Sequence, residues 1–326
     1  MIDSRNSIDW DLLKRRIRTG KLTPIIGDRV GHDGFLTSDD LVQGWANKIG
    51  YPMPNTRSIT RVSQYRSVTK DPLAAKEDYL EYLKQYLLGQ ARQRQGSAGN
   101  FLDTLEDELD MLSFSQVAAR LKYPDFDAEY LNPLKILAQF DIPIYLTTSF
   151  HTFMAQALEK TNKIPRVELC AWSEESGTHT SLFDEDDYTD NTQKPVVYHL
   201  HGLDAEPSTL VLSEDDFLDF LVNITRNEQL VPYRIHQAMA DSSLLLLGYE
   251  LQDWDFRVLF RGLIKSKPAA RRLMSICIQL DPRQNDAGDA AEVEKYLETY
   301  FREYRFEIYW GSAQSFTQDL WEQLGD

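Results

Sequence analysis

Cysteine is the scarcest informative residue in this sequence. Only two cysteines, Cys170 and Cys277, occur among 326 residues. Two thiols cannot build a four-thiolate zinc site, and nothing in their spacing suggests a disulfide framework. We therefore expect no four-cysteine zinc site, and we expect no other bound metal.

Basic residues and long apolar runs are also in short supply. The 35 Lys and Arg residues are outnumbered by 51 Asp and Glu, which gives a formal charge of −16. No basic tail or stripe offsets this charge, so neither a nucleic acid nor an anionic membrane is the expected partner. No apolar run has the length of a membrane span, and residues 1–13 do not have the pattern of a signal peptide. The expected location is the cytoplasm.

Short apolar runs that alternate with helical patterns make up most of the sequence. The expected strands lie at residues 21–27, 142–148, 167–170, 195–200, 244–247, 274–280 and 305–309. Several of these runs are nearly all apolar, as is typical of strands buried on both faces of a parallel sheet. The pattern predicts an α/β fold with a doubly wound, mostly parallel sheet.

Residues 38–140 differ from the rest because they carry helical patterns without strand-like alternation. Ser38 is a plausible N-cap, and Asp71 followed by Pro72 is a strong signal for the start of a helix. Gly89 is a candidate end of that helix. We interpret this stretch as a mostly helical insertion within a single domain that spans residues 1–326.

Four of the expected strands end in glycine or polar residues. These ends are Gly27-Asp28-Arg29, Thr147-Thr148-Ser149, His199-Leu200-His201-Gly202, and Gly248-Tyr249 with Asp253 shortly after. In a parallel sheet they would share one edge, where ligands bind in open α/β folds. Taken singly, each has a plainer explanation, since Ser149 and Asp253 could cap helices and His201 could lie at the surface. Their joint placement favours a binding site.

The order of these motifs resembles the SIR2-like domains of bacterial antiphage immune effectors, which are distant relatives of sirtuins. The most specific motifs are the strand that ends in His201-Gly202 and the pattern L-L-L-G-Y-x-L-x-D-x-x-x-R at residues 245–257. The resemblance implies a Rossmann-like, NAD-binding fold with a helical insertion. It also implies hydrolysis of NAD to nicotinamide and ADP-ribose, which depletes NAD during phage infection. A homo-oligomer, or a partner effector or sensor protein, is the implied assembly.

The resemblance also carries over individual residues. His201 matches the family's catalytic histidine, and a near-neutral imidazole suits a base that acts on a ribose hydroxyl or on water. Ser149 stands at the second catalytic position. The residues expected to hold NAD are Gly27, Asp28, Arg29, Thr148, Gly202, Gly248, Tyr249 and Asp253.

Two motifs depart from the family pattern. Gly27-Asp28-Arg29 replaces a common Gly-Ala-Gly and places a carboxylate where the backbone approaches the pyrophosphate, unless Arg29 compensates for that charge. Ser149 replaces an asparagine that positions the reacting ribose and water, and a hydroxyl has fewer hydrogen-bonding groups than an amide.

Three hypotheses follow. The first is an active NAD glycohydrolase with a diverged site. The second is a weak or inactive SIR2-like protein that binds NAD or ADP-ribose, or that serves as an assembly subunit. The third, ranked last because the chain cannot supply the sirtuins' four-cysteine zinc ribbon, is a deacylase.

Overall fold

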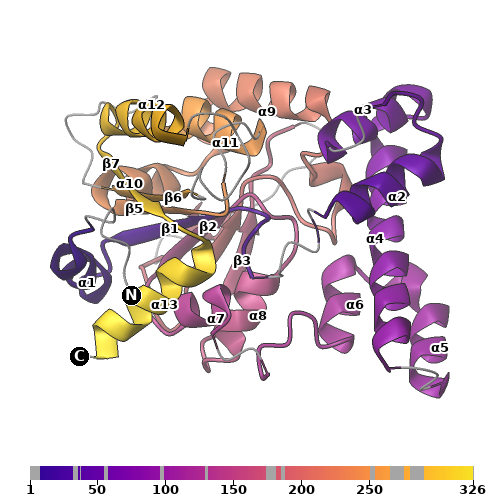
Figure 1. Ribbon diagram of the computed structural model, residues 1–326, viewed down its shortest axis with the longest axis horizontal. Coiled ribbons are helices and arrows are strands. Elements are labelled where there is room, and N and C mark those ends of the chain that lie inside the picture. Colours follow the sequence, from indigo (N-terminus) through magenta and orange to yellow (C-terminus); the bar gives the residue numbers. More distant parts are fainter. Residues whose placement is uncertain are drawn as a thin grey trace.

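The protein is an α/β fold in which two layers of helices enclose a parallel sheet (Figure 1). A computed structural model describes the chain apart from residues 1–7, 32–35, 37, 55–57, 96–98, 129–130, 174–180, 185–187, 250–253, 265–274, 280–289 and 326. The doubly wound architecture predicted from the sequence is confirmed, and every strand pairing in the described part of the chain is parallel.

Seven strands form this sheet within the described residues, in the order β3-β4-β2-β1-β5-β6-β7. They are Leu22–Ile26 (β1), Ile144–Thr147 (β2), Arg166–Leu169 (β3), Val196–His199 (β4), Ser243–Leu247 (β5), Ser275–Gln279 (β6) and Phe306–Trp310 (β7). Strand β1 lies between β2 and β5, so the chain winds outward from β1 in both directions. This reversal is the switch point at which open α/β sheets bind their ligands.

Alternate residues of every described strand except the edge strand β3 enter two separate cores. On one face, Ile26 and Leu247 pack beneath α1 (Trp10–Arg18), α7 (Pro133–Ala138), α8 (Phe153–Glu159) and α13 (Ala313–Gly325). On the other face, Ile25 and Leu246 pack beneath α9 (Glu214–Arg226), α10 (Tyr233–Asp241), α11 (Trp254–Leu259) and α12 (Ala290–Arg302). Burial on both faces explains why the central strands are mostly apolar.

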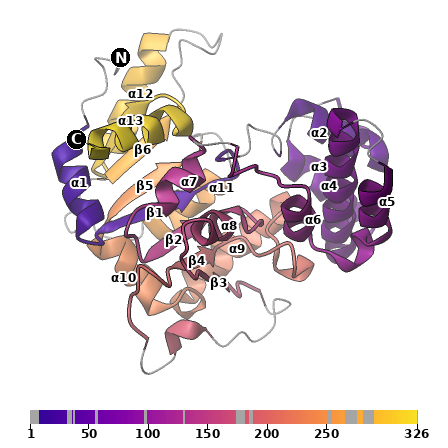
Figure 2. The ribbon, with the colours of Figure 1, turned by 90° about the horizontal axis from the view of Figure 1, so that it is seen from below.

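A group of helices stands beside the sheet (Figure 2). It comprises α2 (Asp39–Ile49), α3 (Ile59–Thr69), α4 (Pro72–Gln95), α5 (Gly99–Asp107) and α6 (Phe114–Arg120). The two predicted helix starts are confirmed, because Ser38 accepts a hydrogen bond from the Leu41 N–H and Asp71 accepts one from the Ala74 N–H. We refer to α2–α6 as the helical insertion.

The expected end of a helix at Gly89 is wrong, because α4 continues to Gln95. Glycine lowers helix propensity, but tertiary packing overrides that preference here. Leu88 packs with Leu102 and Leu105 in a small core of the helical insertion, which keeps this part of α4 helical. Apart from the backbone of its own helix, no atom of the described residues lies within 4 Å of the place where a Gly89 side chain would begin, so no tertiary contact among these residues requires glycine there.

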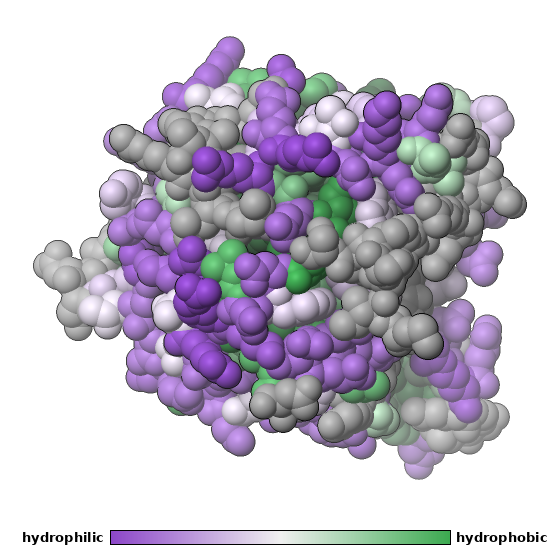
Figure 3. Space-filling model, turned by 60° about the vertical axis from the view of Figure 1, so that its left-hand side comes forward, coloured by the Kyte–Doolittle hydropathy of each residue, from purple (hydrophilic) through white to green (hydrophobic). Residues whose placement is uncertain are grey.

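The surface agrees with the acidic, polar composition. Figure 3 shows one face, on which hydrophilic side chains predominate and hydrophobic ones appear in separate areas. Among the helices of the described residues, none is long and apolar enough to cross a bilayer.

Candidate functional site

The four motif-bearing strand ends lie side by side. Strands β4, β2, β1 and β5 are neighbours in that order. Their register places His199 beside Thr147, Thr147 beside Ile26, and Ile26 beside Leu247. The polar residues that follow these positions therefore emerge together at the carboxyl edge of the sheet, as the sequence predicted.

Two glycines allow the β1 and β5 ends to approach each other closely. A side chain at Gly27 would begin 2.8 Å from the carbonyl oxygen of Gly248 and 3.0 Å from the Tyr249 ring. Gly248 has a φ of +78°, and a side chain there would begin 2.5 Å from the Val30 side chain. Both positions thus need glycine, one for close approach and the other for its backbone conformation as well.

Hydroxyl groups tie the β2 end across β1 to β5. The Thr147 hydroxyl donates to the Ile26 carbonyl and accepts from the Ser149 N–H, both at 2.9 Å. The Thr148 hydroxyl lies 2.9 Å from the Tyr249 hydroxyl, and both side chains are buried. Thr148 and Tyr249, which were predicted as binding residues from separate motifs, are therefore direct partners.

Ser149 does not cap the helix that follows it. Helix α8 begins at Phe153 with Thr152 in the N-cap position, and no side chain caps it. The Ser149 side chain is 1 % exposed, and its Oγ is buried without a hydrogen-bond partner among the described residues. A buried hydroxyl without a partner is costly, so its burial needs another explanation, such as a ligand.

His199 is a residue of this site that the sequence analysis did not select. Its Nδ1 lies 2.8 Å from the Ser149 carbonyl oxygen. Because a carbonyl only accepts, Nδ1 carries the proton and Nε2 the lone pair, and Nε2 is buried without a described partner. Burial lowers the pKa of His199 to about 4, although the Ser149 carbonyl favours the charged ring. The sequence did offer one indication of this role, because His199 is the last residue of β4 and so lies at the carboxyl end of that strand.

His201 lies against an aromatic wall. The rings of Phe217 and Phe220 meet it edge to face, with centroids 5.3 and 4.9 Å away. Burial lowers the pKa of His201 to about 3, so the near-neutral pKa expected from the sequence is wrong, because these apolar neighbours disfavour the imidazolium. The Nε2 atom is buried and has no described hydrogen-bond partner. His201 is therefore a neutral ring whose Nε2 makes no hydrogen bond to a described residue.

The comparison with protein families agrees with this geometry. A family model described as the SIR2-like domain matches residues 143–305, which is half of the chain. The chain belongs to the SIR2-like domain family. No curated protein matches the sequence. Membership supports a sirtuin-related, NAD-linked function. The matched region contains the β2, β4 and β5 ends of this SIR2-like chain, whereas β1 and the helical insertion lie outside it.

The first loop of the SIR2-like chain lies close to the helical insertion. Asp28 is half-buried and Arg29 is exposed. Burial raises the pKa of Tyr79 on α4, and the negative charge of Asp28 raises it further. The Tyr79 ring also meets the Phe150 ring edge to face. The Asp28 carboxylate is therefore near α4. Phe150, which follows β2, contacts the same helix through Tyr79.

The prediction for Asp253 lies outside the described residues, which do not include 250–253. Among the residues that the structure describes, no group of three or more His, Cys, Asp and Glu side chains is arranged to hold a metal ion. Cys170 and Cys277 are both buried, and neither is in a disulfide with another described residue.

Acidification is expected to destabilise the fold through His199 and His201. Unfolded histidines titrate near pH 6.5, whereas the folded rings titrate at about 4 and about 3. The unfolded chain therefore binds more protons below pH 6.5, and the stabilisation present above that pH is lost as the pH falls toward 4. Each ring accounts for about 2 kcal/mol between pH 7 and pH 5.

Urea unfolding at the two pH values measures this effect. In a His199→Gln variant, the decrease in the free energy of unfolding between pH 7 and pH 5 should be about half of that in wild type. The same decrease in wild type and in variants lacking either histidine would contradict the assignment.

Proposed function

We propose that this SIR2-like chain hydrolyses NAD to nicotinamide and ADP-ribose. The observation that carries the proposal is the buried, neutral Nε2 of His201, which has no described partner and which follows β4 at the sheet edge that also holds the β2, β1 and β5 ends. A buried ring nitrogen without a protein partner calls for an explanation, and a bound ligand would supply one.

The residues at the carboxyl edge fit a dinucleotide. Gly27 and Gly248 leave backbone without side chains at the switch point, which is the surface that a pyrophosphate needs for close approach. Thr148 and Tyr249 would hold the neighbouring ribose through their paired hydroxyls. The unpartnered Ser149 hydroxyl would face the reacting ribose or water. Gly202, Arg29 and Asp253 complete the proposed set, with Asp253 on the adenosine ribose.

The chemistry proposed for His201 is proton acceptance. The bond between ribose C1′ and nicotinamide breaks, and its electron pair leaves with nicotinamide, whose ring becomes neutral. Water then adds to C1′, and its proton passes to Nε2 of His201. A neutral imidazole also avoids placing a positive charge beside the oxocarbenium-like ribose, which a histidine of ordinary pKa would partly do.

Incubation with NAD tests the proposal. Nicotinamide and ADP-ribose should appear in equal amounts, at a rate that exceeds a His201→Ala control. No release above that control, in any oligomeric state, would reject the enzyme. The wider role proposed is NAD depletion in antiphage defence, by a homo-oligomer or with a partner effector or sensor. The resemblance to antiphage effectors supports this role.

A second candidate function is binding of NAD or ADP-ribose without turnover, or service as an assembly subunit. Asp28 favours it, because a half-buried carboxylate in the loop after β1 opposes an anionic pyrophosphate. ADP-ribose that binds tightly while NAD stays intact would support this candidate over hydrolysis.

Ser149→Asn tests whether the site is active but diverged. An amide restores the two donors and the acceptor that a hydroxyl lacks, so turnover should rise about tenfold. Steady-state nicotinamide release measures it, with Ser149→Ala as the matched control for loss of the hydroxyl. If turnover does not rise although the variant stays folded, Ser149 does not limit the activity, and Asp28 is the next residue to test.

A further inference from the structure

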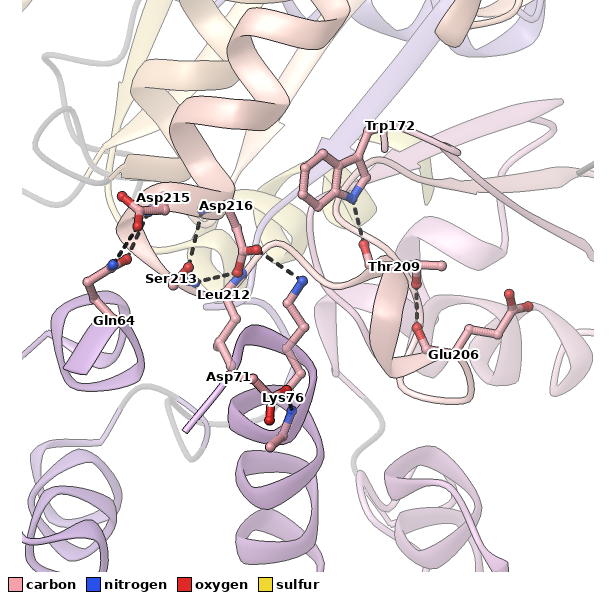
Figure 4. A network of polar contacts seen from close by, with 11 residues as sticks. Gln64, Asp71, Lys76, Trp172, Glu206, Thr209, Leu212, Ser213, Asp215 and Asp216 are labelled. Carbon is pink, nitrogen blue, oxygen red and sulfur yellow. Dashed lines mark hydrogen bonds and ion pairs between the residues drawn. The ribbon is translucent and has the colours of Figure 1, made fainter. Parts of the chain in front are cut away.

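Lys76 of α4 is a buried lysine at the junction between the helical insertion and α9 (Figure 4). Its Nζ lies 3.0 Å from Oδ1 of Asp216, and the two side chains are only 4 % and 9 % exposed. Nζ also lies 5.5 Å from the centroid of the Trp172 ring. Charges this deeply buried persist only when each has its partner, because removing one leaves the other uncompensated. Lys76 therefore fixes Asp216 and Trp172 together.

Asp216 fixes the start of α9. Its Oδ2 accepts hydrogen bonds from the N–H groups of Leu212 and Ser213, at 3.0 and 2.8 Å. Phe217 follows directly, and Phe220 lies one turn further along the same helix. These two rings form the aromatic wall of His201. The position of Asp216 thus sets the position of that wall.

Trp172 fixes the segment that follows His201. Its indole N–H donates to the Thr209 carbonyl at 2.7 Å, as Figure 4 shows. That carbonyl packs against Gly202, where a side chain would begin 2.3 Å from the oxygen. The Trp172 ring also meets Phe220 edge to face. Asp216, which positions the helix that carries the wall of the His201 ring, and Trp172, which positions the segment after His201, therefore both contact the Lys76 ammonium.

We propose that Lys76 is a positioning residue for His201, acting through Asp216 and Trp172. The inference rests on the proposed function for its catalytic meaning, although the packing it concerns exists independently of catalysis. It makes the helical insertion a working part of the site, because a displacement of α4 would move both supports of His201. A ligand or partner that shifts α4 would then change the activity.

The same junction supplies a matched control. The Arg61 Nε lies 3.3 Å from Oε1 of Glu214 across the same two helical layers, but these side chains are 52 % and 32 % exposed. Solvent screens an exposed pair, so its loss should matter little. Arg61→Ala therefore removes a charge of the helical insertion that touches α9 without touching the supports of His201.

The test compares wild type with Lys76→Met and Arg61→Ala by NMR of the histidine rings across a pH titration. In Lys76→Met the His201 signals should move and the titration midpoint should rise toward its ordinary value, since the aromatic wall is no longer held. In Arg61→Ala both should match wild type. In the same preparations, kcat for NAD should fall roughly ten- to a hundredfold in Lys76→Met, with KM within about twofold. Lys76→Arg should recover part of the loss.

Asp216 left unpaired could unfold Lys76→Met, so Lys76→Met with Asp216→Asn is a second variant. The amide neutralises the buried charge and keeps an oxygen for the two N–H groups. Unchanged His201 signals in a folded variant would overturn the proposal, and so would unfolding of both variants while Arg61→Ala folds. If wild type does not hydrolyse NAD, the proposed function fails, but the NMR titration still decides the positioning role.

Discussion

His201→Ala is expected to slow nicotinamide release from NAD by about 10²–10⁴-fold, while ADP-ribose still binds. The reason is that the site needs a group that can accept a proton. Nε2 of His201 is buried, neutral and without a described partner, so it is the nitrogen available to accept the proton of the attacking water. Measuring the rate of nicotinamide release tests the catalytic step, and calorimetric titration with ADP-ribose tests binding. Together they separate a loss of catalysis from a loss of binding.

His236 provides the control for this prediction. It lies on α10, the helix that leads into the amino end of β5, and therefore away from the carboxyl edge. His236→Ala should hydrolyse NAD at the wild-type rate. A His201→Ala variant that is folded and as fast as His236→Ala would contradict the assignment of the base.

Gly202→Ala is expected to destabilise the fold by about 2–5 kcal/mol. Gly202 has a φ of +84°, and a side chain there would begin 2.3 Å from the Thr209 carbonyl oxygen. The backbone conformation costs about 1–2 kcal/mol for a residue with a side chain. The clash with backbone adds about 1–3 kcal/mol, because Thr209 is held by the Trp172 indole and cannot move away freely.

Gly50→Ala separates these two costs. Gly50 ends α2 with a φ of +68°, and, its two chain neighbours apart, no atom of the described residues lies within 4 Å of its would-be side chain. Gly50→Ala should therefore lower the free energy of unfolding only by the cost of the backbone conformation, about 1–2 kcal/mol. Urea unfolding of both variants measures the difference. Equal losses at the two positions would show that the segment from Gly202 to Thr209 adapts, and that the His201 turn is not tightly held.

The sheet and its site edge were predictable because they depend on local patterns. Continuous apolar runs mark strands that are buried on both faces, and the residues that stop them, such as Gly27 and Gly248, mark the carboxyl ends. Once the strands are parallel, those ends must share an edge. The helix starts at Ser38 and Asp71 were predictable for the same reason, since a cap and its helix are neighbours in sequence.

The errors and omissions arise where distant residues decide the outcome. Ser149 has the composition of a cap, but its backbone is held by Thr147 and His199 instead. The pKa of His201 depends on Phe217 and Phe220, whose approach to the ring depends on the fold. Lys76 gave no signal at all, because its partner Asp216 is 140 positions away in the sequence and on another layer.

The central claim is that the carboxyl ends of β4, β2, β1 and β5 form one site for NAD. Hydrogen–deuterium exchange with and without saturating ADP-ribose tests it most directly, because exchange locates the ligand on the fold. The account predicts protection concentrated in residues 27–31, 147–151, 199–204 and 247–249. Bound ADP-ribose that leaves these segments unchanged, or that protects only the opposite edge of the sheet, would contradict it.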